Sequence, residues 1–222
     1  MLTSLLSHLR TLNLPGRSRT GIVWTALVVA MTFSGGLLAL LDEPALVRSD
    51  TTVLAFPVGP QVDPLESIWQ TRQPLDHKRW KYIVIHHSGT LHGSAETLAA
   101  HHRELGFRGL GYQFVIGNGR GAADGSLYVG YRWLDQLPGV HTGGQYGDFY
   151  NRHAIGICLI GDGDRRPFTE AQMQRLTDLV RMLQREFDIP EDHVLLHRNV
   201  ALTSDPGRYF SEADFRQRLQ DF

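Results

Sequence analysis

Two short apolar runs, rich in β-branched residues, constrain the fold of this chain most strongly. Tyr82–His87 reads YIVIHH, and Ala154–Ile160 reads AIGICLI. Continuous apolar runs of this length are typical of buried strands. We therefore expect both segments to be strands, with Ala154–Ile160 at the centre of a sheet.

The rest of the pattern adds shorter strands and helices. Further strands are predicted at Tyr112–Ile116 and Leu127–Tyr131, and Val194–His197 is another short apolar segment. Helices are predicted at Ser94–Gly106, Thr169–Phe187 and Ser211–Leu219. This mixture implies an α/β domain with a single mixed β-sheet flanked by helices.

Two of the helices have a definite apolar face. The helix over Thr169–Phe187 begins with a capping-box pair, Thr169 and Gln172. Its predicted buried stripe is Met173, Leu176, Leu179, Val180 and Leu183. The predicted face of the helix over Ser94–Gly106 is Leu98, Ala99, His102 and Leu105.

The N-terminal part of the chain has the pattern of a membrane segment. Residues 1–20 carry arginines but no acidic residue, and residues 21–41 carry no charge. As a helix this run would be about 30 Å long, which matches a bilayer core. Asp42 and Glu43 follow it, so we expect residues 1–20 in the cytoplasm and the rest of the chain outside. A cleaved signal peptide is the alternative, but the run is long and no small-x-small cleavage site closes it.

Composition limits the remaining organisation. Residues 42–75 are predicted to be a linker, because they lack a sustained period and contain Pro44, Pro57, Pro60, Pro64 and Pro74. Residues 76–222 would form the folded domain. The formal net charge of −1 gives no reason to expect a nucleic-acid partner. The single cysteine, Cys158, excludes an intrachain disulfide and is expected to be buried.

Three places combine metal-ligand residue types with turns or strand ends. They are His86-His87-Ser88, His197, and Asp205 before Pro206-Gly207. Catalytic zinc takes three protein ligands, and histidine nitrogen and carboxylate oxygen both suit it. Spacing alone leaves open that these are surface histidines or hydrogen-bonded core histidines.

Five sequence blocks, in order, cover about residues 80–210. They are YIVIHHSGT, HHRELGFRGLGYQFVIGNG, VHTGG, NRHAIGICLIGD and LLHRNVALTSDPG. Together they resemble the N-acetylmuramoyl-L-alanine amidase family, which includes phage lysozyme-type amidases and peptidoglycan recognition proteins. The resemblance implies one Zn²⁺ per chain, held by His86, His197 and Asp205, the last position being cysteine in many members.

The resemblance also assigns residues around the metal. Tyr112 and Thr203 match family active-site positions, and His141 matches a histidine of the cleft wall, which suggests substrate contact. His141 could instead be a loop histidine without a task. Successive strand residues face opposite sides of the sheet. His87 is therefore expected to pack against its neighbours or to support the site, and not to bind the metal.

Other matched positions are read as structural. His102 is expected to hold the fold. Asn151 is expected to support a loop. Arg198 is expected to orient backbone or carboxylate groups.

The reaction implied is hydrolysis of the amide between the muramic acid lactyl group and L-alanine. Zinc would activate water and polarise the carbonyl, while Tyr112 would donate to the oxyanion and Thr203 would add a hydrogen bond. No glutamate lies at a motif position where it could act as the general acid.

The expected partners are the glycan strand and stem peptide of peptidoglycan and, through residues 21–41, a membrane. The expected location is the bacterial cell envelope, anchored in the inner membrane with the catalytic domain outside.

Three alternatives remain. The chain could bind peptidoglycan without cutting it, as some members do after losing a ligand. It could be a zinc hydrolase that prefers anhydromuropeptides, although predicted export argues against a recycling role. It could also be a membrane-tethered structural protein with incidental histidines.

Overall fold

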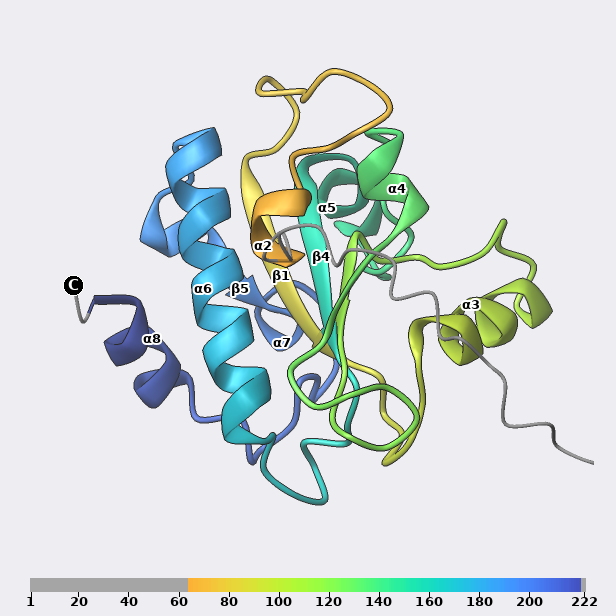
Figure 1. Cartoon of the computed structure of the whole chain (residues 1–222), viewed down its shortest axis with the longest axis vertical. Helices are drawn as coiled ribbons and strands as arrows, with labels where there is room; N and C mark the ends of the chain where they lie inside the picture. The colour runs from red at the N-terminus through yellow and green to blue at the C-terminus, as the bar shows by residue number, and fades with distance from the viewer. Residues whose placement is uncertain (1–63, 221–222) are drawn as a thin grey trace, which may run out of the picture. The chain divides into compact units, whose positions relative to one another are not determined.

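The computed structural model describes residues 64–220 of this chain (Figure 1). The predicted membrane segment at residues 21–41, the basic residues 1–20 and most of the predicted linker lie outside the described residues. Within residues 64–220, no helix has both the length and the apolar character needed to span a bilayer.

The strands form one five-stranded sheet in the order β3-β2-β4-β1-β5. The strands are β1 (Tyr82–His87), β2 (Phe114–Ile116), β3 (Leu127–Val129), β4 (Ala154–Leu159) and β5 (Val194–Leu196). β4 pairs in parallel with β1 and β2, and β1 pairs in parallel with β5. β3 alone runs antiparallel, on β2. The predicted single mixed sheet with Ala154–Ile160 at its centre is therefore confirmed.

The helices surround this sheet. They are α2 (Pro64–Ser67), α3 (Ala95–Glu104), α4 (Tyr131–Leu134), α5 (Gly147–His153), α6 (Glu170–Phe187), α7 (His197–Val200) and α8 (Glu212–Gln220), with a short 3₁₀ helix at Glu191–His193. The capping box of α6 is present as predicted, and every residue of its predicted stripe is buried.

Each face of the sheet has its own apolar cluster. Residues of α2, α6 and α8 pack with Ile83, Ile85 and other strand residues in the larger cluster, and Figure 1 shows α6 and α2 in front of the strands. On the opposite face, Leu98 of α3 packs with Val115 and Cys158. Because side chains alternate along a strand, His86 follows Ile85 onto this second face, beside its register partner Cys158.

Several details of these predictions differ from the structure. The second strand begins at Phe114 rather than Tyr112, because Gly111 and Tyr112 still belong to the loop that contacts Val140. The third strand ends at Val129, since Gly130 caps the short helix α4. Leu105 was expected on the buried face of α3, but it caps the helix and is 58% exposed.

The end of the predicted linker packs on the domain instead of tethering it. Leu65 and Ile68 are buried in the large cluster. The indole Nε1 of Trp133 donates to the carbonyl of Ile68 at 2.7 Å. Arg72 donates twice to the carboxylate of Asp135, at 2.6 and 2.7 Å. Pro64 is the first residue of α2, and the folded unit includes residues 64–75.

Candidate metal centre

The three candidate ligands meet at one edge of the sheet. His86 lies at the carboxyl end of β1, and His197 begins α7 directly after β5. Because β1 and β5 are parallel neighbours, their carboxyl ends lie side by side. Asp205 lies on the loop that returns from α7 to this edge.

Two imidazoles converge on a single carboxylate oxygen. His86 Nδ1 lies 3.3 Å from Asp205 Oδ2, and His197 Nδ1 lies 2.8 Å from the same atom. One ligand atom from each residue lies within 4.8 Å of the others. His86 is fully buried, Asp205 is buried, and His197 is partly buried.

The backbone holds Asp205 in this position. Its second oxygen, Oδ1, accepts the backbone N–H of His87 at 2.7 Å. The backbone N–H of Arg198 donates to the Asp205 carbonyl at 2.8 Å. The Arg198 side chain donates to the Gly207 carbonyl and to Glu212, which confirms its orienting role.

The electrostatics favour the protonation states that a metal requires. Burial lowers the pKa of His86, although the neighbouring Asp205 opposes part of this effect. Burial raises the pKa of Asp205, but hydrogen bonds from His197 and His86 outweigh it and leave that pKa below its ordinary value. A neutral imidazole and an ionised carboxylate are the forms that bind metal.

This donor set fits zinc. Two imidazole nitrogens and one carboxylate oxygen give three protein ligands, the number typical of a catalytic zinc site that keeps one position free. His86 and Asp205 are buried, and the three side chains lie close together. They are therefore not scattered surface residues. His86, His197 and Asp205 are therefore brought together as the sequence predicted.

Tyr112 and Thr203 border this cluster. The ring centroid of Tyr112 lies 5.2 Å from that of His86, on the α3 side. Burial raises the pKa of the Tyr112 phenol well above its usual value, with smaller effects from Cys158 and Asp205, so the hydroxyl remains protonated. Thr203 is exposed, and its Oγ1 accepts the backbone N–H of Asp205 at 3.2 Å.

His141 lies closer to the ligands than a cleft-wall residue would. It is buried, and its Nδ1 lies 3.0 Å from His86 Nε2. Burial and the neighbouring His86 lower its pKa well below the usual value. Asn151 holds this loop as predicted, because its Oδ1 accepts the backbone N–H groups of His141 and Thr142.

The two remaining histidines of the motifs support the structure. His102 Nδ1 accepts the backbone N–H of Gly111 at 2.9 Å, which confirms its structural role. His87 points away from the ligands, and its Nδ1 accepts the backbone N–H of Gly163 at 3.0 Å. The predicted alternation between His86 and His87 is confirmed.

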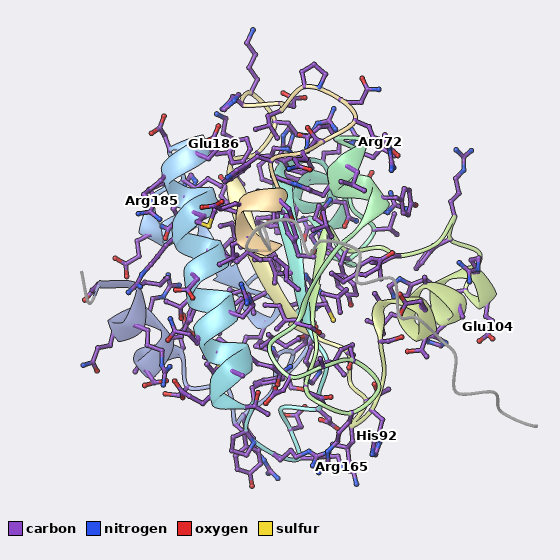
Figure 2. The ribbon with its side chains drawn as sticks, viewed as in Figure 1. Arg72, His92, Glu104, Arg165, Arg185 and Glu186 are labelled. Carbon is purple, nitrogen blue, oxygen red and sulfur yellow. The ribbon has the colours of Figure 1, made fainter. Side chains whose placement is uncertain are left out.

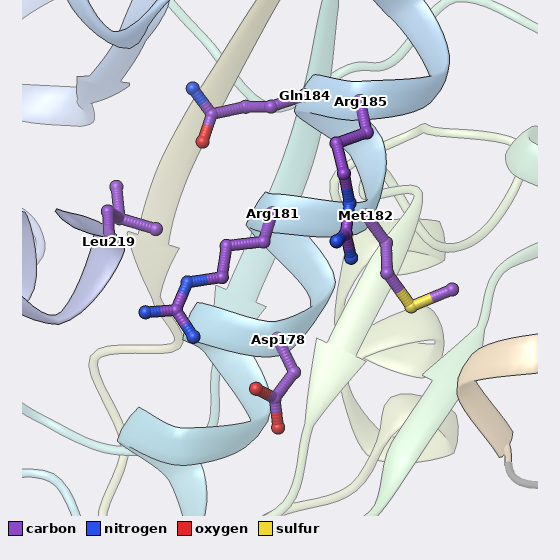
Figure 3. A pocket seen from close by; sticks show the side chains of 6 residues that line it. All are labelled: Asp178, Arg181, Met182, Gln184, Arg185 and Leu219. Atoms are coloured by element: carbon purple, nitrogen blue, oxygen red, sulfur yellow. The ribbon is translucent and has the colours of Figure 1, made fainter. Parts of the chain in front are cut away.

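A separate groove of about 520 Å³ lies along α6 and α8 (Figure 3). Its lining side chains are Asp178, Arg181, Met182, Gln184, Arg185 and Leu219. None of them belongs to the ligand cluster. Charged side chains such as Arg72, Glu104 and Arg185 point outward from the helices and loops (Figure 2).

Sequence comparison decides the family. The family model for N-acetylmuramoyl-L-alanine amidase matches residues 76–208, which include all three candidate ligands. The chain belongs to this amidase family. The family expectation drawn from the five sequence blocks is thus confirmed.

Individual relatives include both recognition proteins and lytic enzymes. Peptidoglycan-recognition protein SA of Drosophila melanogaster is 35% identical over 137 residues, covering 57% of this chain and 62% of that protein. An endolysin of Enterobacteria phage T3 is 34% identical over 113 residues, covering 48% of this chain and 64% of the endolysin. The chain therefore spans less than two thirds of these relatives.

A solved structure supports the same fold. N-acetylmuramoyl-L-alanine amidase LysC from Clostridium intestinale URNW superposes with a TM-score of 0.56 at 27% identity, covering 67% of this chain and 91% of that chain. The mixed sheet flanked by helices is thus the fold of a solved amidase.

Two features beside the candidate ligands were not predicted from the sequence. One is the contact between His141 and His86, which are separated by 55 positions with no periodic pattern that links them. The other is the role of Gly156 in the central strand. A glycine inside a strand often marks the close approach of another group, and here that group is the ring of His141.

Proposed function

We propose that this chain is a zinc-dependent amidase that hydrolyses the amide between N-acetylmuramic acid and L-alanine in peptidoglycan. The observation that carries the proposal is the convergence of His86 Nδ1 and His197 Nδ1 on Asp205 Oδ2 at the carboxyl edge of the sheet. All three positions hold residue types competent to bind zinc. A recognition protein without catalysis would not require this complete set.

The residues around the cluster have distinct tasks in such a reaction. Zinc held by His86, His197 and Asp205 would supply a Lewis acid that polarises the amide carbonyl and activates water. The Tyr112 hydroxyl, which burial keeps protonated and which hydrogen-bonds with Cys158, would donate to the oxyanion that forms on the carbonyl. The Thr203 hydroxyl oxygen accepts the backbone N–H of Asp205, so the Thr203 O–H remains available to donate.

The proposal extends to where the enzyme works. We propose that residues 21–41 anchor the chain in the inner membrane and leave the amidase domain in the cell envelope, where peptidoglycan lies. The support is the uncharged run, with arginines before it and acidic residues after it. Protease added to spheroplasts should degrade the domain. Protection of the domain until the cells are lysed would contradict this orientation.

The activity is tested with purified chain and purified peptidoglycan. We expect release of stem peptides with free N-terminal L-alanine, loss of release with a chelator, and recovery when zinc is returned. Binding of zinc and peptidoglycan without release would instead favour the recognition function. Release of products by cleavage within the glycan or the peptide would contradict the proposed bond.

A further inference from the structure

His141 occupies a position with a specific relation to one ligand. Its Nδ1 lies 3.0 Å from Nε2 of His86, the nitrogen opposite the one that faces Asp205. The two rings meet edge to face, with centroids 4.9 Å apart and planes at 73°. His141 is 8% exposed, so little of its surface is available to a substrate.

Two glycines leave a slot, a space without side chains, for the His141 ring. A Cβ added to Gly156 of β4 would lie 2.5 Å from His141 Cδ2, and its three nearest atoms all belong to the His141 ring. A Cβ added to Gly139 would lie 2.2 Å from the same carbon. Two glycines thus make room for the imidazole, and Asn151 fixes the backbone that carries it.

The hydrogen-bond chemistry of the pair then follows from ligation. A neutral histidine that binds a metal through Nδ1 carries its proton on Nε2. In His86 that Nε2–H points at His141 Nδ1, which must therefore present a lone pair. The second nitrogen of a metal-binding histidine commonly donates to such a partner, which fixes the ring and raises its basicity as a ligand.

We propose that His141 is a positioning residue that accepts a hydrogen bond from His86 and fixes this ligand's tautomer and orientation for zinc, rather than a substrate contact. This inference rests on the metal site of the proposed function. It replaces the substrate contact expected from the sequence with a role inside the metal centre.

Thr142 provides a necessary control. Its Oγ1 also lies 3.0 Å from His141 Nδ1, so this hydroxyl competes for the same lone pair. Thr142→Val removes the competitor and leaves the contact with His86 in place. We expect this variant to bind zinc as tightly as the parent or more tightly.

The decisive measurement is zinc affinity, determined by competition with a chelator of known affinity on folded, full-length protein. His141→Leu removes the acceptor and should weaken zinc binding about 10- to 100-fold. His141→Asn offers an amide oxygen near the former Nδ1 and should restore most of the affinity. Equal affinity in His141→Leu and the parent would overturn the inference. Equal loss in the Leu and Asn variants would also overturn it, because a missing acceptor would then not be the cause.

Gly156→Ala tests the slot without removing the imidazole. The added methyl group should displace the ring and weaken zinc binding in the parent. In a His141→Ala background, where the ring is absent, the same change should cause no further loss. Additive losses would contradict the proposed contact. A folded parent that binds no zinc would overturn the metal site itself, whereas a zinc-binding parent with an unaffected His141→Leu variant would overturn only the role of His141.

A spectroscopic readout separates positioning from general loss of structure. In ¹⁵N NMR spectra of the zinc-loaded parent, His86 Nε2 should be protonated and coupled to His141 Nδ1 across the hydrogen bond. That coupling should vanish in His141→Asn while zinc remains bound. A His86 ring protonated on Nδ1 in the zinc-loaded protein would rule the assignment out.

Discussion

Hydrogen bonds to both carboxylate oxygens and to the backbone of Asp205 hold it at the candidate metal centre. One oxygen faces His86 and His197, the other accepts the His87 backbone N–H, and its own backbone N–H donates to Thr203. Hydrogen bonds to both oxygens restrain the carboxylate from rotating. At the residue scale, these hydrogen bonds help to fix the geometry of the candidate ligands.

Tyr112 is the residue whose change should separate binding from catalysis. Its ring borders His86, and it is not one of the ligand cluster. Tyr112→Phe keeps the ring and removes the proposed oxyanion donor, so zinc content should be unchanged while kcat falls about 100-fold or more. Metal analysis and steady-state kinetics on the same preparation check both parts. Near-parental turnover would remove Tyr112 from catalysis.

Cys158 gives a prediction about alkaline stability. It is buried as predicted, and burial raises the pKa of its thiol well above the ordinary value. Above about pH 8.5 the unfolded chain ionises this thiol and the folded chain does not, so the unfolded state binds fewer protons. The free energy of unfolding should therefore fall by up to about 1.4 kcal/mol per pH unit.

Urea unfolding of chelator-treated protein between pH 7.5 and pH 9.5 measures this slope. Cys158→Ala lacks the group and should show a correspondingly shallower fall over the same range. Identical slopes in the two proteins would mean that the Cys158 thiol titrates alike in the folded and unfolded states.

At the scale of elements, one side chain of helix α6 makes hydrogen bonds to the sheet. Gln172 is almost fully buried, and its Nε2 donates to the carbonyls of Ile116 and Ile160 at the ends of β2 and β4. Its Oε1 accepts the backbone N–H of Thr169, which completes the capping box. The sequence predicted the cap but not the two bonds to strands, because a capping pattern is local and those carbonyls come from distant segments.

The extra hydrogen bonds of Gln172 predict that its substitution lowers the free energy of unfolding more than substitution of Thr169 does. Thr169→Ala should cost about 1 kcal/mol in the free energy of unfolding, as is usual for a lost N-cap. Gln172→Ala should cost about 2–3 kcal/mol, because it also leaves buried polar groups with fewer partners. Gln174→Ala, on the exposed face of the same helix, serves as the matched control and should stay within about 0.5 kcal/mol. A Gln172 variant no weaker than the Thr169 variant would show that the strand contacts contribute little.

At the scale of the whole molecule, local pattern located most strands and the long helices, and the family resemblance located the candidate ligands. The strands Val194–Leu196 and Ala154–Leu159 coincide with apolar runs of the sequence. The short helix α2 could not be found this way, because four residues give no period and the surrounding prolines resemble a linker. Leu65 of α2, and Ile68 directly after it, pack in a core formed by segments far along the chain.

The contribution of α2 and the residue after it to the stability of the domain can be measured. Ile68 has no exposed surface, so Ile68→Ala should destabilise the domain by about 2–5 kcal/mol. Leu105→Ala changes a residue that is 58% exposed and should have an effect within about 0.5 kcal/mol. Denaturant unfolding of the two variants gives the comparison. Similar small effects at both positions would mean that residues 64–75 do not belong to the cooperative unit.

Zinc stoichiometry tests the central claim most directly. Metal analysis would be carried out on the purified full-length chain and on His86→Ala, His197→Ala and Asp205→Ala, with circular dichroism to verify folding. His101→Ala, an exposed histidine on α3, is the matched control. The account predicts one zinc per chain in the parent and the control, and a large loss in each ligand variant. A folded parent without zinc after zinc resupply, or a ligand variant with full stoichiometry, would contradict it.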